Sequence, residues 1–197
     1  LIGSPEVLFF PSAYKRAARY GQLDAANEVL RTETLSRLQD ERVPLIIVSY
    51  PDALAEKTVS RDQLAEKTLK LSTGDRVDAS FVGEVLDDYG FQYVDYVYEP
   101  GQYAVRGSIL DVFSFSGELP YRIDFFGDEV ETIRTFDLET QLSREKLNEV
   151  RILPEFTRNG RLQAALFDSL PEKCLVGVED MRWVASRVES LNQDELH

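Results

Sequence analysis

The chain has 197 residues, of which 43% are hydrophobic, so it can fill one substantial core or two small ones. Its formal net charge of −13 argues against a general affinity for DNA or RNA, because phosphate backbones require a basic surface. No apolar run approaches the roughly 18 residues of a transmembrane helix. The opening LIGSPEV also lacks signal-peptide features. We therefore expect a cytoplasmic protein without membrane contact.

The acidic residues are concentrated in the middle of the chain. Between Ser72 and Glu149 there are 17 acidic and 6 basic residues, whereas the remainder holds 18 acidic and 16 basic residues. This difference in composition predicts three stretches. We expect residues 1–70 to be the first part of an α/β domain, residues 71–150 to be an inserted α+β domain, and residues 151–197 to return to the α/β domain.

The first stretch alternates strands and helices. EVLFFP predicts a short strand, and LDAANEVLRTETLSRLQ predicts a helix because apolar residues recur near the helical period from Leu23 to Leu38. The β-branched run PLIIVSY predicts a buried parallel strand. Two short helices follow, PDALAEK with Pro51 in its first turn and SRDQLAEKT with Ser60 as its N-cap. This order predicts an α/β layer.

The middle stretch changes its hydrophobic period. DASFVGEVLDDYG predicts an amphipathic helix with Phe81 on its apolar side and Gly90 as its stop signal. The sequence then alternates in twos, from FQYVDYVY through YAVRGSILDVFSF and LPYRIDFF to EVETIRTF. EPGQ fits a type II turn, and SFSG and FGDE fit hairpin connections. We expect one helix on a meandering antiparallel sheet.

The closing stretch returns to the first pattern. RLQAALFDSL predicts a helix, CLVGVED an apolar strand, and MRWVASRVESLNQ a final helix. Cys174, the one cysteine, lies in the apolar run, so we expect a buried thiol. A single cysteine rules out a disulfide within the chain and a metal site built from several cysteines.

Motifs for nucleotide chemistry are missing from the sequence. There is no Gly-Lys pair for a phosphate-binding loop and no Gly-x-Gly-x-x-Gly for a dinucleotide. The only histidine is His197, the last residue, which removes serine-histidine and cysteine-histidine nucleophile arrangements. We therefore expect a protein that is not an enzyme and that carries no cofactor and no metal.

Two other interpretations remain open at this point. Asp111, Asp124 and Asp128 could hold a divalent cation in a carboxylate-dependent phosphoesterase or nuclease, although hairpins also collect acids for solubility. Alternatively, the nearly neutral flanks, with basic pairs such as Lys15–Arg16, could contact DNA directly. Metal-dependent turnover would reveal the first, and weak binding with a strong salt dependence the second.

The segment LPYRIDFF places an aromatic residue among charges. Alternate residues from Leu119 face the core, so that Arg122, Asp124 and Phe126 share the opposite, outward face. A mixture of arginine, acid and aromatic is typical of the energetic centres of protein interfaces. If the strands form a meander, Arg106 from the neighbouring hairpin reaches the same patch. The alternative is that an α/β layer covers Phe126 beside an ordinary surface ion pair.

These residues also carry a family resemblance. The stretch YEPGQYAVRGSILDVFSFSGELPYRIDFFGDEVETIRTFDLETQLS resembles the UvrB-homologous module of bacterial transcription-repair coupling factors, the Mfd family. PSAYKRAARYGQLDAANEVLRTETLSRL resembles the region upstream of it, and the likeness is strong from about Phe9 to Phe156. It implies an incomplete, degenerate helicase-like α/β domain of RecA type, with no ATPase motifs. It also implies an inserted domain that recruits the nucleotide-excision-repair protein UvrA.

The resemblance also implies particular partners and residues. The whole family protein is an ATP-dependent DNA translocase that binds RNA polymerase and DNA through domains that we do not expect in this chain. The residues that contact UvrA in the family correspond here to Arg106, Arg122, Asp124 and Phe126. Ala104 stands where the UvrB branch commonly has a further arginine. The contacts with UvrA are therefore expected to differ in detail from those of UvrB.

Overall fold

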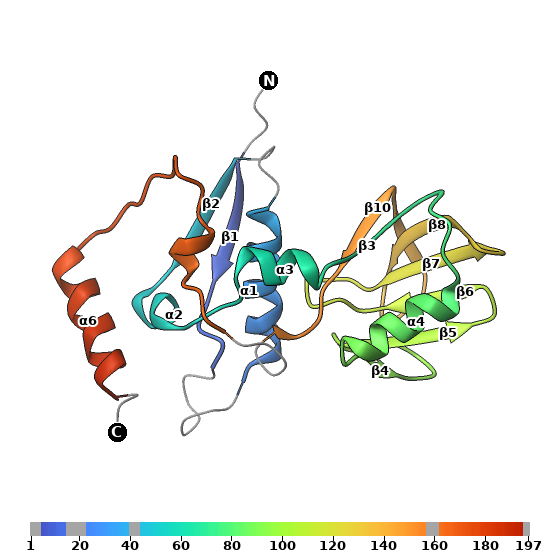
Figure 1. Cartoon of the computed structure of the whole chain (residues 1–197), viewed down its shortest axis with the longest axis horizontal. Coiled ribbons are helices and arrows are strands. Elements are labelled where there is room, and N and C mark those ends of the chain that lie inside the picture. Colours follow the sequence, from blue (N-terminus) through green and yellow to red (C-terminus); the bar gives the residue numbers. More distant parts are fainter. Residues whose placement is uncertain (1–4, 15–22, 40–43, 157–161, 195–197) are drawn as a thin grey trace. The chain divides into compact units, whose positions relative to one another are not determined.

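The computed structural model describes residues 5–14, 23–39, 44–156 and 162–194 (Figure 1). The basic pair Lys15–Arg16 lies outside the described residues. The chain divides into two compact units, one formed by Leu1–Leu64 with Phe156–His197 and the other by Ala65–Glu155. None of the helices in the described part is both long and apolar enough to cross a membrane.

The first unit contains a strand-helix-strand motif, as the sequence predicted. Strands β1 (Glu6–Phe10) and β2 (Leu45–Ser49) are parallel, and helix α1 (Ala25–Arg37) connects them and packs against β1 (Figure 1). Helix α2 (Pro51–Ala55) begins at a proline, whose missing N–H costs nothing in a first helical turn.

Helix α3 (Arg61–Glu66) has the predicted N-cap. The Gln63 backbone N–H donates to Ser60 Oγ at 3.2 Å, and the Ser60 N–H donates to Gln63 Oε1 at 3.1 Å. These reciprocal bonds form a capping box, which satisfies two backbone donors that have no partner within the helix. The sequence S-x-x-Q is therefore enough to start this short helix.

The predicted burial of β2 is wrong. The strand pairs with β1 in parallel, but its side chains alternate between half-buried and exposed. Among the described residues this sheet has only two strands, and α1 packs on one of its faces. Apolar side chains on the other face are exposed, and they lie in register across the two strands: Val7, Phe9, Ile46 and Val48.

The closing stretch differs most from its prediction. The described residues of RLQAALFDSL form no α-helix: they contain the 3-10 turn η1 (Leu166–Ser169) and a β-bridge from Ala164 to Thr58. The run CLVGVED forms no strand, because no described strand pairs with it, and Cys174 is exposed instead of buried. Only the last prediction for this stretch is confirmed, since helix α6 (Met181–Asp194) is present and packs against α2.

The second unit contains one helix and two sheets. Helix α4 (Ala79–Asp88) begins at Asp78, whose carboxylate accepts from the Ser80 N–H at 2.7 Å, and ends before Gly90, which has a φ of 81°. A small antiparallel sheet pairs β3 (Leu69–Ser72) with β10 (Glu149–Ile152). A six-stranded sheet follows the order β4 (Gln92–Tyr93), β5 (Gln102–Arg106), β6 (Ile109–Val112), β7 (Tyr121–Phe126), β8 (Glu129–Phe136), β9 (Ser143–Leu147).

The packing of α4 on the six-stranded sheet matches the prediction of one helix on a meander. Val82 and Leu86 of the helix are fully buried, and Gly83 packs against the Tyr103 ring of β5. Phe81, expected on the apolar side, is exposed, because the buried stripe runs through the neighbouring Val82 instead. The class is therefore mixed α/β.

Two details of the sheet refine the meander. All neighbouring strands are antiparallel except β4, which is two residues long and runs parallel to β5. The turn before β5 has the predicted form, because Gly101 has a φ of 85° and the Gln102 N–H donates to Glu99 O at 3.3 Å. This turn fixes where β5 begins and hence which residues face α4.

Candidate partner-binding surface

The strand register places the predicted site residues on one face of the six-stranded sheet. Asp111 of β6 lies opposite Ala104 of β5 on one side and Arg122 of β7 on the other, and Arg122 lies opposite Arg134 of β8. Paired residues share a face, and α4 packs on the other face, which carries the fully buried Ile123. We call the face with Asp111 and Arg122 the outer face.

A buried carboxylate at the centre of the outer face accepts hydrogen bonds from both arginines that the sequence predicted as site residues. The Asp111 side chain is 1% exposed. Arg122 donates through Nε to Asp111 Oδ1 and through Nη2 to Oδ2, both at 2.8 Å. Arg106 donates through Nη2 to the same Oδ2. This bidentate pair with a second cation explains how a charge at this depth is tolerated.

The guanidinium of Arg122 is also fixed on its other sides. Its Nη1 donates to the Gln141 carbonyl oxygen at 3.1 Å, and its carbon lies 4.4 Å from the centre of the Phe136 ring. The hydrogen bonds to Asp111 raise the pKa of Arg122 above its ordinary value. The side chain is only 15% exposed, and most of its hydrogen-bond donors are used within the protein.

A small hydrophobic cluster lies on the outer face, next to Asp111 and Arg122. Its buried members come from the loop before β5, from β5 itself and from the ends of β6 and β8: Val97, Ala104, Phe113 and Phe136. Val94 and Leu138 pack against it. Segments 94–97 and 136–138 therefore cover part of a sheet face that alternation alone would leave in water. We call this part the sealed half.

The remainder of the outer face, the open half, is exposed around the end of β7. Asp124 accepts from Thr132 Oγ1 at 2.6 Å and also binds Arg134. A β-bulge after Asp124 leaves Glu131 without a partner on β7, and β7 ends at Phe126. Phe126 is 76% exposed, beside a two-residue turn that begins with Gly127 at a φ of 63°.

The structure thus separates the four predicted residues into two groups. Arg106 and Arg122 meet at Asp111, while Asp124 and Phe126 belong to the open half. Arg106 keeps a more open position than Arg122: it is 36% exposed, donates to Asp95 O at 2.9 Å and lies 5.2 Å from the Tyr96 ring centre. The guanidinium groups of Arg106 and Arg122 therefore make most of their hydrogen bonds within the protein.

Sequence reasoning missed Asp111 as the common acceptor and Arg134 as a member of the face. Alternation in EVETIRTF places Thr132, Arg134 and Phe136 on one side, which was a usable signal for Arg134. The role of Asp111 required the register between β6 and β7, which no single strand reveals.

Two of the three acids proposed for metal chemistry, Asp111 and Asp124, have other partners. Both oxygens of Asp111 bind arginines, and Asp124 binds Thr132 and Arg134. Over the described ranges, no three histidine, cysteine or acidic side chains come together as a metal ligand set. This arrangement gives the phosphoesterase interpretation no ligand set to build on.

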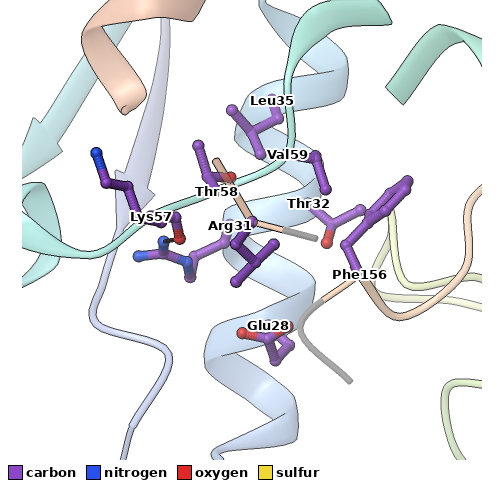
Figure 2. A pocket seen from close by; sticks show the side chains of 9 residues that line it. Glu28, Arg31, Thr32, Leu35, Lys57, Thr58, Val59 and Phe156 are labelled. Atoms are coloured by element: carbon purple, nitrogen blue, oxygen red, sulfur yellow. Dashed lines mark hydrogen bonds between the residues drawn. The ribbon is translucent and has the colours of Figure 1, made fainter. Parts of the chain in front are cut away.

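Figure 2 shows a pocket in the first unit, beside α1. Arg31 lies at its wall, 4.2 Å from the Phe10 ring centre, and donates to Pro11 O at 2.7 Å and to Lys57 O at 3.3 Å. It also pairs with Glu56 at 3.1 Å, and its burial lowers its pKa. These contacts indicate that Arg31 joins β1 and α1 to the segment after α2. The pocket is lined by Glu28, Arg31, Thr32, Leu35, Lys57, Thr58, Val59, Phe156 and Leu162.

Comparison with known proteins identifies the second unit. Residues 69–157, which cover the six-stranded sheet and its helix, match the family model of the UvrB interaction domain. The second unit is therefore similar to a UvrB interaction domain.

A larger part of the chain is similar to transcription-repair-coupling factors. It is 35% identical to that of Escherichia coli over 124 residues, which are 63% of this chain and 11% of the relative. It is 30% identical to that of Haemophilus influenzae over 155 residues, which are 78% of this chain and 13% of the relative. The chain is thus a relative of the transcription-repair coupling factors, as the resemblance predicted, and the match spans little more than a tenth of their length.

Proposed function

We propose that this chain recruits UvrA through the outer face of its UvrB interaction domain and takes part in transcription-coupled nucleotide excision repair by binding, without catalysis. Arg106, Arg122, Asp124 and Phe126 form the binding patch in this proposal. The observation that supports it most is Phe126, a phenylalanine 76% exposed, two residues beyond the half-buried Asp124 that pairs with Arg134.

The side chains of the patch have the chemistry of a surface that binds another protein. An exposed phenylalanine offers apolar area that a partner can remove from water, and the polar groups around it fix its orientation. Arg106 has part of its guanidinium exposed and can meet a carboxylate of UvrA. Arg122 and Asp111 keep Arg106 and the neighbouring backbone in place.

The test is calorimetric titration of this chain with UvrA. We expect saturable binding by the wild type and a loss of about 2 kcal/mol or more in Phe126→Ala, as for a central interface anchor. The melting temperature of Phe126→Ala should stay unchanged, because the ring is exposed. Tyr98→Ala, which removes another exposed aromatic of the same unit, serves as the control. An affinity equal to wild type in Phe126→Ala would contradict the proposal.

Within this proposal the other functions of the family fall outside the chain. ATP-driven translocation and contacts with RNA polymerase and DNA belong to other domains of a coupling factor. The first unit then corresponds to a degenerate helicase-like domain interrupted by residues 71–150, and the protein acts in the cytoplasm. The division of the chain at Leu64 and Phe156 supports an inserted domain of about this extent.

A further inference from the structure

The outer face continues beyond the four predicted residues. Arg122 of β7 lies opposite Arg134 of β8, which in turn lies opposite Lys146 of β9. We infer that Arg134 and Lys146 extend the binding patch and contact an acidic surface of the partner, with Asp124 acting as the positioning residue for Arg134. This inference rests on the proposed function, because it concerns the same face and the same partner.

The hydrogen bonds distinguish Arg134 from Arg122. Arg122 uses Nε, Nη1 and Nη2 on Asp111 and Gln141. Arg134 uses only Nη2, on Asp124, and its Nε–H is buried without an acceptor among the described residues. Its side chain is 36% exposed, so the guanidinium has donors to spare at the surface. Arg134 therefore fits direct contact with a carboxylate better than Arg122 does.

Lys146 supplies a second cation at the next strand. Its side chain is exposed, and no ion pair holds it within the described part of the chain. Lys146 lies directly opposite Arg134, and like charges in this position repel each other. A partner carboxylate between them would relieve this repulsion, which gives the pair a physical reason to bind acidic groups.

The charge of the row contrasts with that of its unit. The unit Ala65–Glu155 holds 19 acidic and 9 basic residues. The row that crosses β6 to β9 holds one acid, the buried Asp111, followed by Arg122, Arg134 and Lys146. A basic row on an acidic unit selects an acidic partner surface.

Asp124 contributes to this row through Arg134. Its carboxylate is 17% exposed and is engaged by Thr132 Oγ1 and by the Arg134 guanidinium. It therefore offers little surface of its own to a partner. Its position fixes the direction in which Arg134 presents the donors that remain.

The first test compares two double variants by titration with UvrA at several salt concentrations. Arg134→Gln/Lys146→Gln removes the row, and Arg151→Gln/Lys70→Gln removes the same charge from the β3–β10 sheet of the same unit. Only in the first variant do we expect about tenfold weaker binding and an affinity that depends less on salt. The reason is that charges at the rim of an interface mainly raise the association rate, and salt screens this effect.

The outcomes separate the two proposals. If the wild type does not bind UvrA, the proposed function fails and this inference with it. If the wild type binds, Phe126→Ala does not, and the two double variants bind equally, the inference is overturned while the proposed function stands. Melting temperatures of both double variants verify that each protein is folded.

A double-mutant cycle tests the role of Asp124. Asp124→Asn and Arg134→Gln should each weaken UvrA binding, and the combined variant should bind no more weakly than Arg134→Gln alone, because both changes remove one contact. Additive losses would show that Asp124 contacts UvrA directly and would overturn its positioning role. A purely structural role predicts coupling in the unfolding free energy without coupling in affinity.

Discussion

The two halves of the outer face belong to one sheet and differ in almost every physical respect. In the sealed half, Phe136 is fully buried beneath the Arg122 guanidinium, and Asp111 is closed between two arginines. In the open half, Phe126 is largely exposed two residues beyond Asp124. Strand alternation assigns both halves to the same side. The segments that cross the sheet decide which half is core and which is surface.

This contrast assigns different tasks to similar residues. Removal of one charged residue from the sealed half should destabilise the fold, because its partner is then left buried without a counter-charge. A residue in the open half contributes little to stability and is available for binding. Variants on the two halves should therefore separate loss of stability from loss of affinity.

The largest effect is expected for Asp111→Ala. It leaves Arg122 without its bidentate acceptor over a buried ring, so we expect the free energy of unfolding to fall by about 3 kcal/mol. Urea unfolding of the chain measures it. Asp128→Ala, in the exposed turn after Phe126, is the control and should change stability by less than about 0.5 kcal/mol. Equal effects of the two variants would remove the distinction between the halves.

Arg122→Lys should have an intermediate effect. Lysine keeps the charge but cannot reproduce the planar fork on Asp111, so we expect a loss of about 1.5–2 kcal/mol in unfolding free energy. Arg144→Lys, at a more exposed pair with Asp137, should be nearly neutral. If Arg122→Lys proved as neutral as its control, Arg122 would belong functionally to the open half.

The smallest effect concerns pH and the turn that carries Gln141. Hydrogen bonds from the Thr140 backbone N–H, and next from its hydroxyl, lower the pKa of Asp137 below its ordinary value. A carboxylate whose pKa is lower in the folded state stabilises the protein above its ordinary pKa, and this contribution disappears as the pH falls through the folded-state value. The melting-temperature difference between wild type and Asp137→Asn should therefore shrink below about pH 4. A difference independent of pH would contradict this assignment.

The sequence predicted the sheet of the second unit well because its signals are local. Alternation placed Arg122, Asp124 and Phe126 on one face, and the Pro-Gly pair set the turn before β5. The hydrogen-bond partners of these residues within the chain could not be predicted from local alternation. The contacts of Arg122 with Asp111 and Gln141 join segments whose proximity depends on register.

The first unit shows where such local signals fail. PLIIVSY and CLVGVED have similar apolar composition, yet among the residues that the structure describes only the first pairs with a neighbouring strand. Backbone pairing decides whether an apolar run becomes a strand, and composition does not report it. The burial of Arg31 was equally hidden, since its acceptors Pro11 and Lys57 lie in loops far along the chain.

Cys174 has a practical consequence for the study of this protein. It is the one sulfhydryl in the sequence, it is exposed, and it lies in the first unit, whereas the proposed patch lies in the second. A maleimide fluorophore should therefore attach at a single position without any engineered substitution. Fluorescence anisotropy of that label would then follow complex formation with every residue of the patch unmodified.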